Sequence, residues 1–146
     1  MADRHPDKDL IALGIQQPWA ELILRGIKTI EVRSLGTRQR GTIYVYASKR
    51  ASNCPAAARA IATHGLDLDA LPRGSIVGTV DIVGSRPCAS DDGASACLPA
   101  SYLDGCHSWM LENPNRFAEP LAVRFLPYGV WFYPFQRRNR HRRRPA

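Results

Sequence analysis

Apolar and polar positions alternate with a period of two along much of this 146-residue chain, which predicts a fold built mainly from short β-strands. A run rich in β-branched residues at 75–83 is the clearest strand, and Gly78 within it indicates a bulge or a barrel corner. The pattern places strands at residues 10–15, 29–33, 42–48, 75–83, 121–125 and 129–133, and a further short strand or extended segment at 107–111.

Two stretches show the period of a helix instead. Residues 18–25 begin with a proline, whose missing N–H costs nothing at the first helical position, and Gly26 follows as a stop. The alanine-rich segment 54–65 is the second helix, with Ser52 or Asn53 as its cap and Gly65 as its stop. Because strands and helices do not alternate regularly, the pattern favours an α+β, mainly β fold: a small mixed β-barrel of about six strands with two or three short helices.

The length of the chain suits one domain with one core, which we place at residues 10–135. Residues 1–9 are polar and are expected to be a disordered end. Residues 84–106 are small, polar and interrupted by proline and glycine, so we expect a partly mobile surface insertion there.

Charge is concentrated at the C-terminal end. The net charge is +7, and the tail 136–146 contains six arginines and no acidic residue, so the rest of the chain is nearly neutral. Such a block binds polyanions by releasing counterions, and we expect its deletion to weaken such binding and its salt dependence. A solubilising tail and a localisation signal remain alternatives.

Composition narrows the cellular setting. The N-terminal residues lack the apolar segment of a secretory signal, and no apolar run is long enough to cross a bilayer, so we expect an intracellular monomer without membrane contact. The four cysteines (54, 88, 97 and 106) form no C-x-x-C pair. We therefore expect free thiols, no metal site and no cofactor.

The segment GIKTIEVRS (26–34) carries the most concentrated side-chain chemistry of the chain. Glu31 and Arg33 share one strand face, and Lys28 precedes them at the turn. This face is either a solvated charged surface or the floor of a binding site, and composition alone favours the first. If strands 29–33 and 42–48 pair, the cations lie beside Tyr44 and Tyr46, which would suit a single-stranded nucleic acid.

The order of the motifs favours the binding site. QPWAELILRGIKTIEVRS, then RGTIYVYASK, LPRGSIVGTVDIV, SWMLENPNRFAEPLAV and YGVWFY resemble, in this order, the segments of the ASCH (ASC-1 homology) family of the PUA-like superfamily. The family pattern G-x-K-x-x-E-x-R corresponds to Gly26, Lys28, Glu31 and Arg33, and the resemblance covers about residues 10–133.

The resemblance implies a PUA-like barrel that binds nucleic acid, with RNA favoured over DNA, in a cleft lined by this segment. Ile30 and Val32 would then hold the strand to the barrel while the charged side chains face the ligand. Candidate ligand-binding residues are Lys28, Glu31, Arg33, Arg40, Tyr44, Tyr46, Ser48, Lys49, Trp109, Arg137, Arg138 and Arg140.

Two alternatives stay open. A hydrolase acting on an acylcytidine-type nucleoside or on single-stranded RNA would use Lys28 and Glu31 as catalytic candidates. The amidohydrolases of the superfamily, however, have a threonine three residues after the lysine, where this chain has Glu31, and Thr29 stands at a different place. The sequence therefore favours binding over catalysis. A protein-interaction adaptor that uses residues 84–106 is the other alternative.

Overall fold

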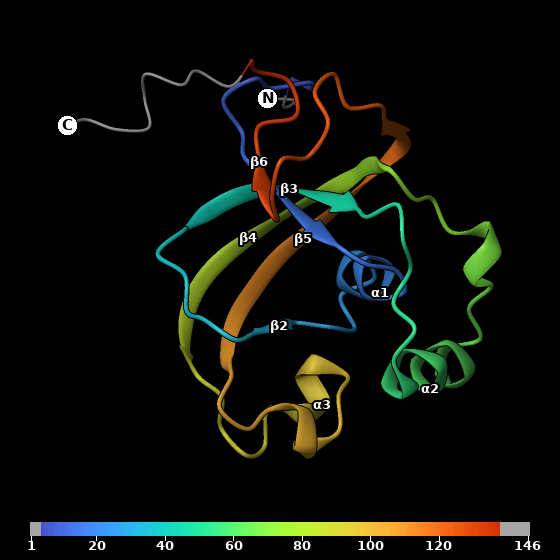
Figure 1. Ribbon diagram of the computed structural model, residues 1–146, viewed down its shortest axis with the longest axis vertical. Helices are drawn as coiled ribbons and strands as arrows, with labels where there is room; N and C mark the ends of the chain where they lie inside the picture. The colour runs from blue at the N-terminus through green and yellow to red at the C-terminus, as the bar shows by residue number, and fades with distance from the viewer. Residues whose placement is uncertain (1–3, 138–146) are drawn as a thin grey trace.

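The computed structural model describes residues 4–137, which form one curved six-stranded sheet with three short helices around it (Figure 1). The strands are β1 (Ala12–Ile15), β2 (Ile30–Arg33), β3 (Gly41–Ala47), β4 (Ser75–Pro87), β5 (His107–Leu121) and β6 (Trp131–Phe132). The helices are α1 (Trp19–Leu24), α2 (Pro55–His64) and α3 (Gly93–Ala96), and single 3-10 turns lie at η1 (Leu68–Ala70) and η2 (Ala100–Tyr102). The expected α+β, mainly β architecture is confirmed.

The strands follow the order β2-β5-β4-β3-β1-β6 and curl into a half-barrel. Neighbours are antiparallel except β1 and β3, which are parallel. The register between β4 and β5 shifts at Ile76/Gly78, so the expected bulge is confirmed. A Cβ at Gly78 would collide with the carbonyl oxygen of Asn115, so the backbone of β5 approaches more closely than any larger residue would permit.

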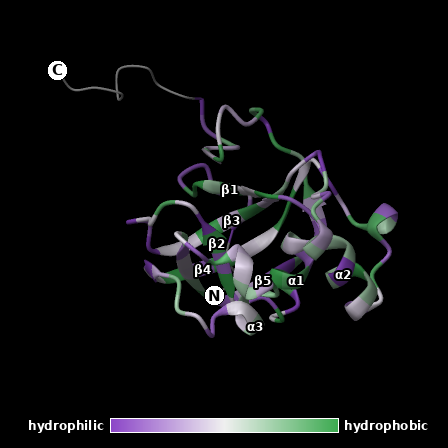
Figure 2. Cartoon of the chain, turned by 60° about the horizontal axis from the view of Figure 1, so that its bottom comes forward, coloured by the Kyte–Doolittle hydropathy of each residue, from purple (hydrophilic) through white to green (hydrophobic). Residues whose placement is uncertain are grey.

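Apolar side chains are buried on both faces of the sheet. The inner cluster lies under α1 and includes Leu13, Ile23, Val45, Val80 and Trp109. The outer cluster is smaller and includes Ala12, Tyr44, Tyr46, Ile76 and Phe132. Figure 2 shows hydrophobic colour along much of the strands and hydrophilic colour in many of the connecting segments. Alternate residues of β3 therefore serve opposite faces.

Strand lengths differ from those expected. Residues 107–121 form one continuous strand, although the turn-forming residues Asn113 and Pro114 suggested a loop. Asn113 adopts a positive φ of 54°, and the ladder with β4 is irregular between Thr79 and Asp81, so a bulge absorbs these residues. Residues 122–125 form no strand, and β6 has only two residues.

The ends of other elements also differ from the expectation. Cys54, and neither Ser52 nor Asn53, is the N-cap of α2, whereas Gly65 ends that helix with a left-handed φ of 60°, as expected. Residues 4–9, expected to be disordered, lie against β3, where the Asp7 N–H donates to the Tyr44 hydroxyl at 2.7 Å.

No helix within residues 4–137 is long and apolar enough to cross a membrane.

Candidate functional site

Lys28, Glu31 and Arg33 form a buried ionic network at the β2 edge of the sheet. The Nε atom of Arg33 donates to Glu31 Oε2 at 2.7 Å, and Lys28 Nζ lies 3.9 Å from Glu31 Oε1. Only 3% of Lys28 and 7% of Glu31 is exposed. The segment is therefore not a solvated strand face, and it is not an open floor either.

The orientation of β2 is the reverse of the expected one. β2 pairs with β5, and Glu31 lies opposite Trp109, whereas Val32 lies opposite Ser108. Directly opposed residues of an antiparallel pair point to the same face. Glu31 and Arg33 therefore face the inner cluster, and Val32 faces the other side. The alternation of the sequence was correct, but the charged residues and not the apolar ones point into the barrel.

Aromatic rings make this burial of charge possible. Lys28 Nζ lies 5.0 Å from the centre of the Trp19 ring, and the Arg33 guanidinium lies 5.6 Å from that of Trp109. Trp109 stacks on Trp131 at 5.8 Å and donates its indole N–H to the carbonyl oxygen of Leu35 at 2.9 Å. The tryptophans thus act as the walls of the network, although only Trp109 was predicted to belong to the site.

The segment between β4 and β5 covers Lys28. We name residues 88–106 the cap. Lys28 Nζ donates to the carbonyl oxygen of Ala96 at 2.6 Å, and the N–H of Thr29 donates to that of Ser95 at 2.8 Å. The Arg86 guanidinium anchors the cap through two hydrogen bonds to the Asp92 carboxylate, at 2.7 and 2.9 Å. The expected insertion is therefore packed onto the network, and part of its range, 84–87, belongs to β4.

Burial lowers the pKa of the Lys28 ammonium, because removal from water disfavours its charged form. The carboxylate of Glu31 opposes this shift by stabilising the charge. The Cys97 thiol is near enough to interact with Lys28, and burial raises the pKa of that thiol. The Glu31 carboxylate is thus the neighbouring group that favours the charged form of the buried Lys28.

Arg33 connects the network to a second, open site. Its Nη2 atom donates to the carbonyl oxygen of Gly14 at 3.0 Å, across the barrel from β2 to β1. Gly14 lines a cavity of about 410 Å³, and its N–H donates to the carbonyl oxygen of Val130 at 2.8 Å. The charged segment therefore supports the wall of a cavity that it does not itself line. The other lining residues are Tyr46, Ser48, Lys49, Leu126, Pro127 and Gly129.

Three donor side chains of this cavity are without partners. Within residues 4–137, the hydroxyls of Tyr46 and Ser48 and the ammonium of Lys49 make no hydrogen bond or ion pair. Tyr46 is only 3% exposed, and burial raises the pKa of its hydroxyl, which keeps it a proton donor. The opposite wall is apolar, with Leu126 64% and Val130 56% exposed. The cavity thus combines free donors with an uncovered apolar wall.

Other predicted residues lie elsewhere. β3 pairs with β1 and β4, so the expected pairing of β2 with β3 is wrong, and Tyr44 does not lie beside Lys28. The Tyr44 hydroxyl is bonded instead to His5 Nδ1 at 2.7 Å. Arg40 is exposed and donates to carbonyl oxygens of its own loop.

The tail contributes little to the described structure. Arg137 lies with its guanidinium 5.8 Å from the centre of the Phe125 ring. Arg138 and Arg140 lie outside the described residues, so their predicted role stays a prediction.

A further group of residues was missed by the sequence analysis. Lys49 also lines a neighbouring groove of about 570 Å³, together with Arg50, Asn53 and Arg73. Of these residues, only Lys49 was a predicted site residue. Arg50 follows it directly, but nothing in the sequence links this pair to Arg73 in a separate loop, so the grouping of the three cations was not predicted.

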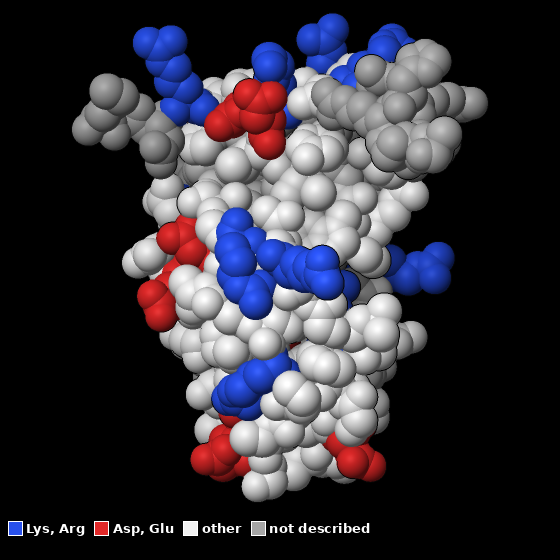
Figure 3. All heavy atoms as spheres, turned by 90° about the vertical axis from the view of Figure 1, so that its left-hand side faces the viewer, with Lys and Arg blue, Asp and Glu red and all other residues white. Residues whose placement is uncertain are grey.

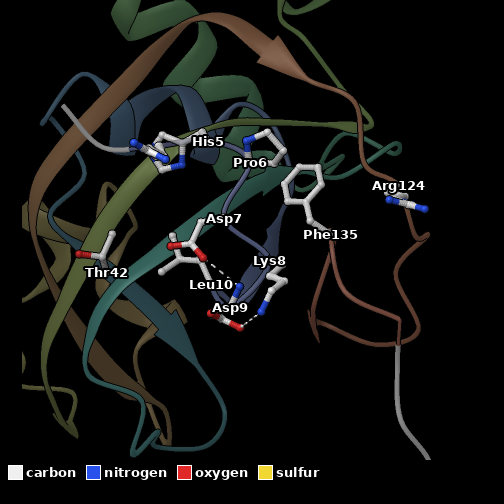
Figure 4. A pocket seen from close by; sticks show the side chains of 10 residues that line it. His5, Pro6, Asp7, Lys8, Asp9, Leu10, Thr42, Arg124 and Phe135 are labelled. Carbon is white, nitrogen blue, oxygen red and sulfur yellow. Dashed lines mark hydrogen bonds and ion pairs between the residues drawn. The ribbon is translucent and has the colours of Figure 1, made fainter.

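A cavity of about 740 Å³ lies at the N-terminal segment (Figure 4). Two acidic residues, Asp7 and Asp9, line it together with the cations Arg4, Lys8 and Arg124. Lys8 forms an ion pair with Asp9 at 3.1 Å, and Asp7 stands beside them and accepts the N–H of Asp9. We therefore regard this cavity as less suited to a polyanion than the one lined by Tyr46.

Comparison with known proteins agrees with this architecture. The family model of the ASCH domain matches residues 13–121, and the chain belongs to the ASCH domain family. Activating signal cointegrator 1 of Homo sapiens and of Mus musculus are each 33% identical to it over 128 residues, which is 82% of the chain. This region is 21% of the length of those proteins, so the chain spans about a fifth of these relatives.

Solved structures show the same fold. The crystal structure of ASCH from Zymomonas mobilis superposes with a TM-score of 0.58 at 16% identity, covering 87% of this chain and 88% of that one. A tyrosine-to-phenylalanine mutant of the same protein superposes equally well, with a TM-score of 0.58 at 15% identity, covering 87% and 90% of the two chains. At this level of identity the likeness concerns the fold alone.

Proposed function

We propose that the chain is a nucleic-acid-binding ASCH domain that prefers RNA to DNA and holds one nucleotide of a single strand in the Tyr46 cavity. The observation that supports this is the convergence of three free donors, Tyr46, Ser48 and Lys49, on one open cavity. Its volume of about 410 Å³ falls in the usual range of small-molecule sites, about 300–1,000 Å³.

The lining has the chemistry that a nucleotide requires. The ammonium of Lys49 suits a phosphate, and the hydroxyls of Tyr46 and Ser48 suit phosphate oxygens, a base carbonyl or the ribose 2′-hydroxyl. The apolar wall formed by Leu126 and Val130 suits the face of a base. The arginine tail would add affinity that is independent of sequence.

The state of Lys28 and Glu31 supports a binding function better than hydrolysis by these two residues. Lys28 is engaged by Ala96 and Glu31 by Arg33, and both residues are buried, so a substrate would reach them only after the cap moves. The adaptor alternative would require the cap to be free for a partner, whereas its inner side is held to the network by the carbonyl oxygens of Ala96, on Lys28, and Ser95, on Thr29.

Fluorescence anisotropy with a labelled eight-nucleotide single-stranded RNA tests the proposal. Tyr46→Phe removes only the hydroxyl, and Lys49→Gln removes only the charge. Because a hydrogen bond to a charged group contributes about 1.5–3 kcal/mol, we expect each change to weaken binding by roughly tenfold or more. The DNA of the same sequence should bind more weakly to the unsubstituted protein, because it lacks the 2′-hydroxyl.

Tyr44→Phe is the matched control, since Tyr44 lies two residues away on the same face of β3, but its hydroxyl is already bonded to His5 and does not line the cavity. This change should leave the affinity for RNA unaltered. If Tyr46→Phe binds RNA as tightly as the unsubstituted protein, the cavity is not the binding site.

A further inference from the structure

Lys49, Arg50 and Arg73 are three cations without a counter-charge. Within residues 4–137 none of them makes a hydrogen bond, an ion pair or a contact with an aromatic ring. Most other described arginines are engaged: Arg25 and Arg116 with Glu21, for example, and Arg86 with Asp92. The three free cations are thus available to a ligand.

These cations are gathered at one groove that continues the Tyr46 cavity. Lys49 lines both hollows, and Arg50, Asn53 and Arg73 line the groove of about 570 Å³ beyond it. No described acidic residue lines either one. The acids nearest in sequence, Asp67 and Asp69, flank the lining residue Leu68, and the carboxylate of Asp67 accepts the N–H of Asp69.

The charge arrangement on another face is different. Figure 3 shows the face at the left of Figure 1, where Lys and Arg side chains lie in separate groups with Asp or Glu close to them. A polyanion on that face would meet both signs of charge. The groove lined by Lys49, Arg50 and Arg73 is the better candidate for continuous contact with phosphates.

We infer that this groove is the track of a phosphodiester backbone, so that the ligand is a single strand and not a free nucleoside. The inference rests on the proposed function. Lys49 would hold the phosphate of the nucleotide in the cavity, and Arg50 and Arg73 the phosphates of the nucleotides that follow. The side-chain amide of Asn53, which is exposed at the same groove, is suited to sugar or base edges.

The test compares the double substitution Arg50→Gln/Arg73→Gln with the matched pair Arg38→Gln/Arg59→Gln. All four arginines are exposed and have no partner among the described residues, so both variants lose the same charge and should fold normally. Binding of labelled uridine oligonucleotides of one, four and eight nucleotides is measured by anisotropy over a series of salt concentrations.

We expect the eight-nucleotide RNA to bind Arg50→Gln/Arg73→Gln at least about fivefold more weakly, with the slope of log K against log salt reduced by about 1.4, which corresponds to two phosphate contacts on a single strand. The mononucleotide should bind both variants equally. If Arg38→Gln/Arg59→Gln loses as much affinity for the RNA, or if the slope for Arg50→Gln/Arg73→Gln is unchanged, the inference that this groove binds the phosphodiester backbone is wrong.

Three further outcomes are informative. A hexaglutamate peptide that competes as well as RNA would assign the groove to an acidic protein partner and overturn the inference. If Tyr46→Phe weakens binding of the strand while Arg50→Gln/Arg73→Gln does not, the track is wrong and the proposed function stands. If the unsubstituted protein binds none of the oligonucleotides, both fail together.

Discussion

Replacing Glu31 by glutamine tests the reasoning about the buried network most directly. Glutamine keeps the size of the side chain and one acceptor for Arg33, but it removes the only carboxylate that the structure places beside both Lys28 and Arg33. Removing one partner of a buried ion pair costs about 3–5 kcal/mol, because the remaining charge is left uncompensated. We expect Glu31→Gln to lower the free energy of unfolding by about 3 kcal/mol, near the low end of that range.

The loss should depend on pH. Burial holds the pKa of Lys28 below its ordinary value, so between the two pKa values the unfolded chain binds more protons than the folded one, and stability rises with pH. Glu31 raises the pKa of Lys28, so this pKa is lower in the Glu31→Gln variant. The pH range over which stability rises therefore begins at a lower pH in the variant. The difference in the free energy of unfolding between the variant and the unsubstituted protein should therefore shrink as pH approaches 10.5, the ordinary pKa of lysine.

Urea unfolding followed by circular dichroism measures both effects. Glu112→Gln, an exposed substitution on β5, is the control and should stay within about 0.5 kcal/mol of the unsubstituted protein. A loss below about 1 kcal/mol for Glu31→Gln, or a loss that is the same at pH 7 and pH 10, would mean that the cations are hydrated in place and that the burial argument is wrong.

Other predictions concern the cap and the sheet. Asp92→Asn should speed amide hydrogen exchange of residues 89–105 by about tenfold or more, because it removes the charge from both bonds to Arg86, while exchange in α2 stays unchanged. Arg86 lowers the pKa of Asp92, so this contribution is complete above about pH 4 and is lost as pH falls; the protection factors of the unsubstituted cap, corrected for the intrinsic pH dependence of exchange, should therefore fall in acid. Gly78→Ala should reduce stability by at least about 2 kcal/mol in thermal unfolding, because its Cβ would meet the Asn115 carbonyl. Gly129→Ala, whose Cβ would make only an ordinary contact at 3.7 Å, should be nearly neutral, and an equal loss for both would refute the close approach.

The sequence predicted the elements well because alternation and helix stops are local signals. The helix at 18–25, the stop at Gly65 and the strand bulge at Gly78 could all be read from neighbouring residues. Alternation identifies two faces of a strand, but it does not say which face is inside. For β2 the usual rule, apolar inside, gave the wrong answer, because Trp19 and Trp109 from distant segments make the inner side suitable for cations.

The site was predicted only in part for a related reason. The residues from Tyr46 to Lys49 could be recognised from their motif, since they are consecutive on one strand and the turn after it. Tyr44 has the same spacing, but its hydroxyl is taken by His5 and Asp7 from a segment expected to be disordered. Arg50 and Arg73 are brought together only by the tertiary structure, which no local pattern encodes.

The bond from Arg33 to the Gly14 carbonyl has a consequence for how this fold could vary. Five strand junctions of the half-barrel are made by backbone ladders, which tolerate almost any side chain. The remaining gap, between β2 at one edge and β1 near the other, is spanned by a guanidinium. This gap is thus bridged by a side chain and not by backbone hydrogen bonds. Exchanging Arg33 for lysine or glutamine would change the bridge without altering any ladder, so this junction can vary while the fold remains the same.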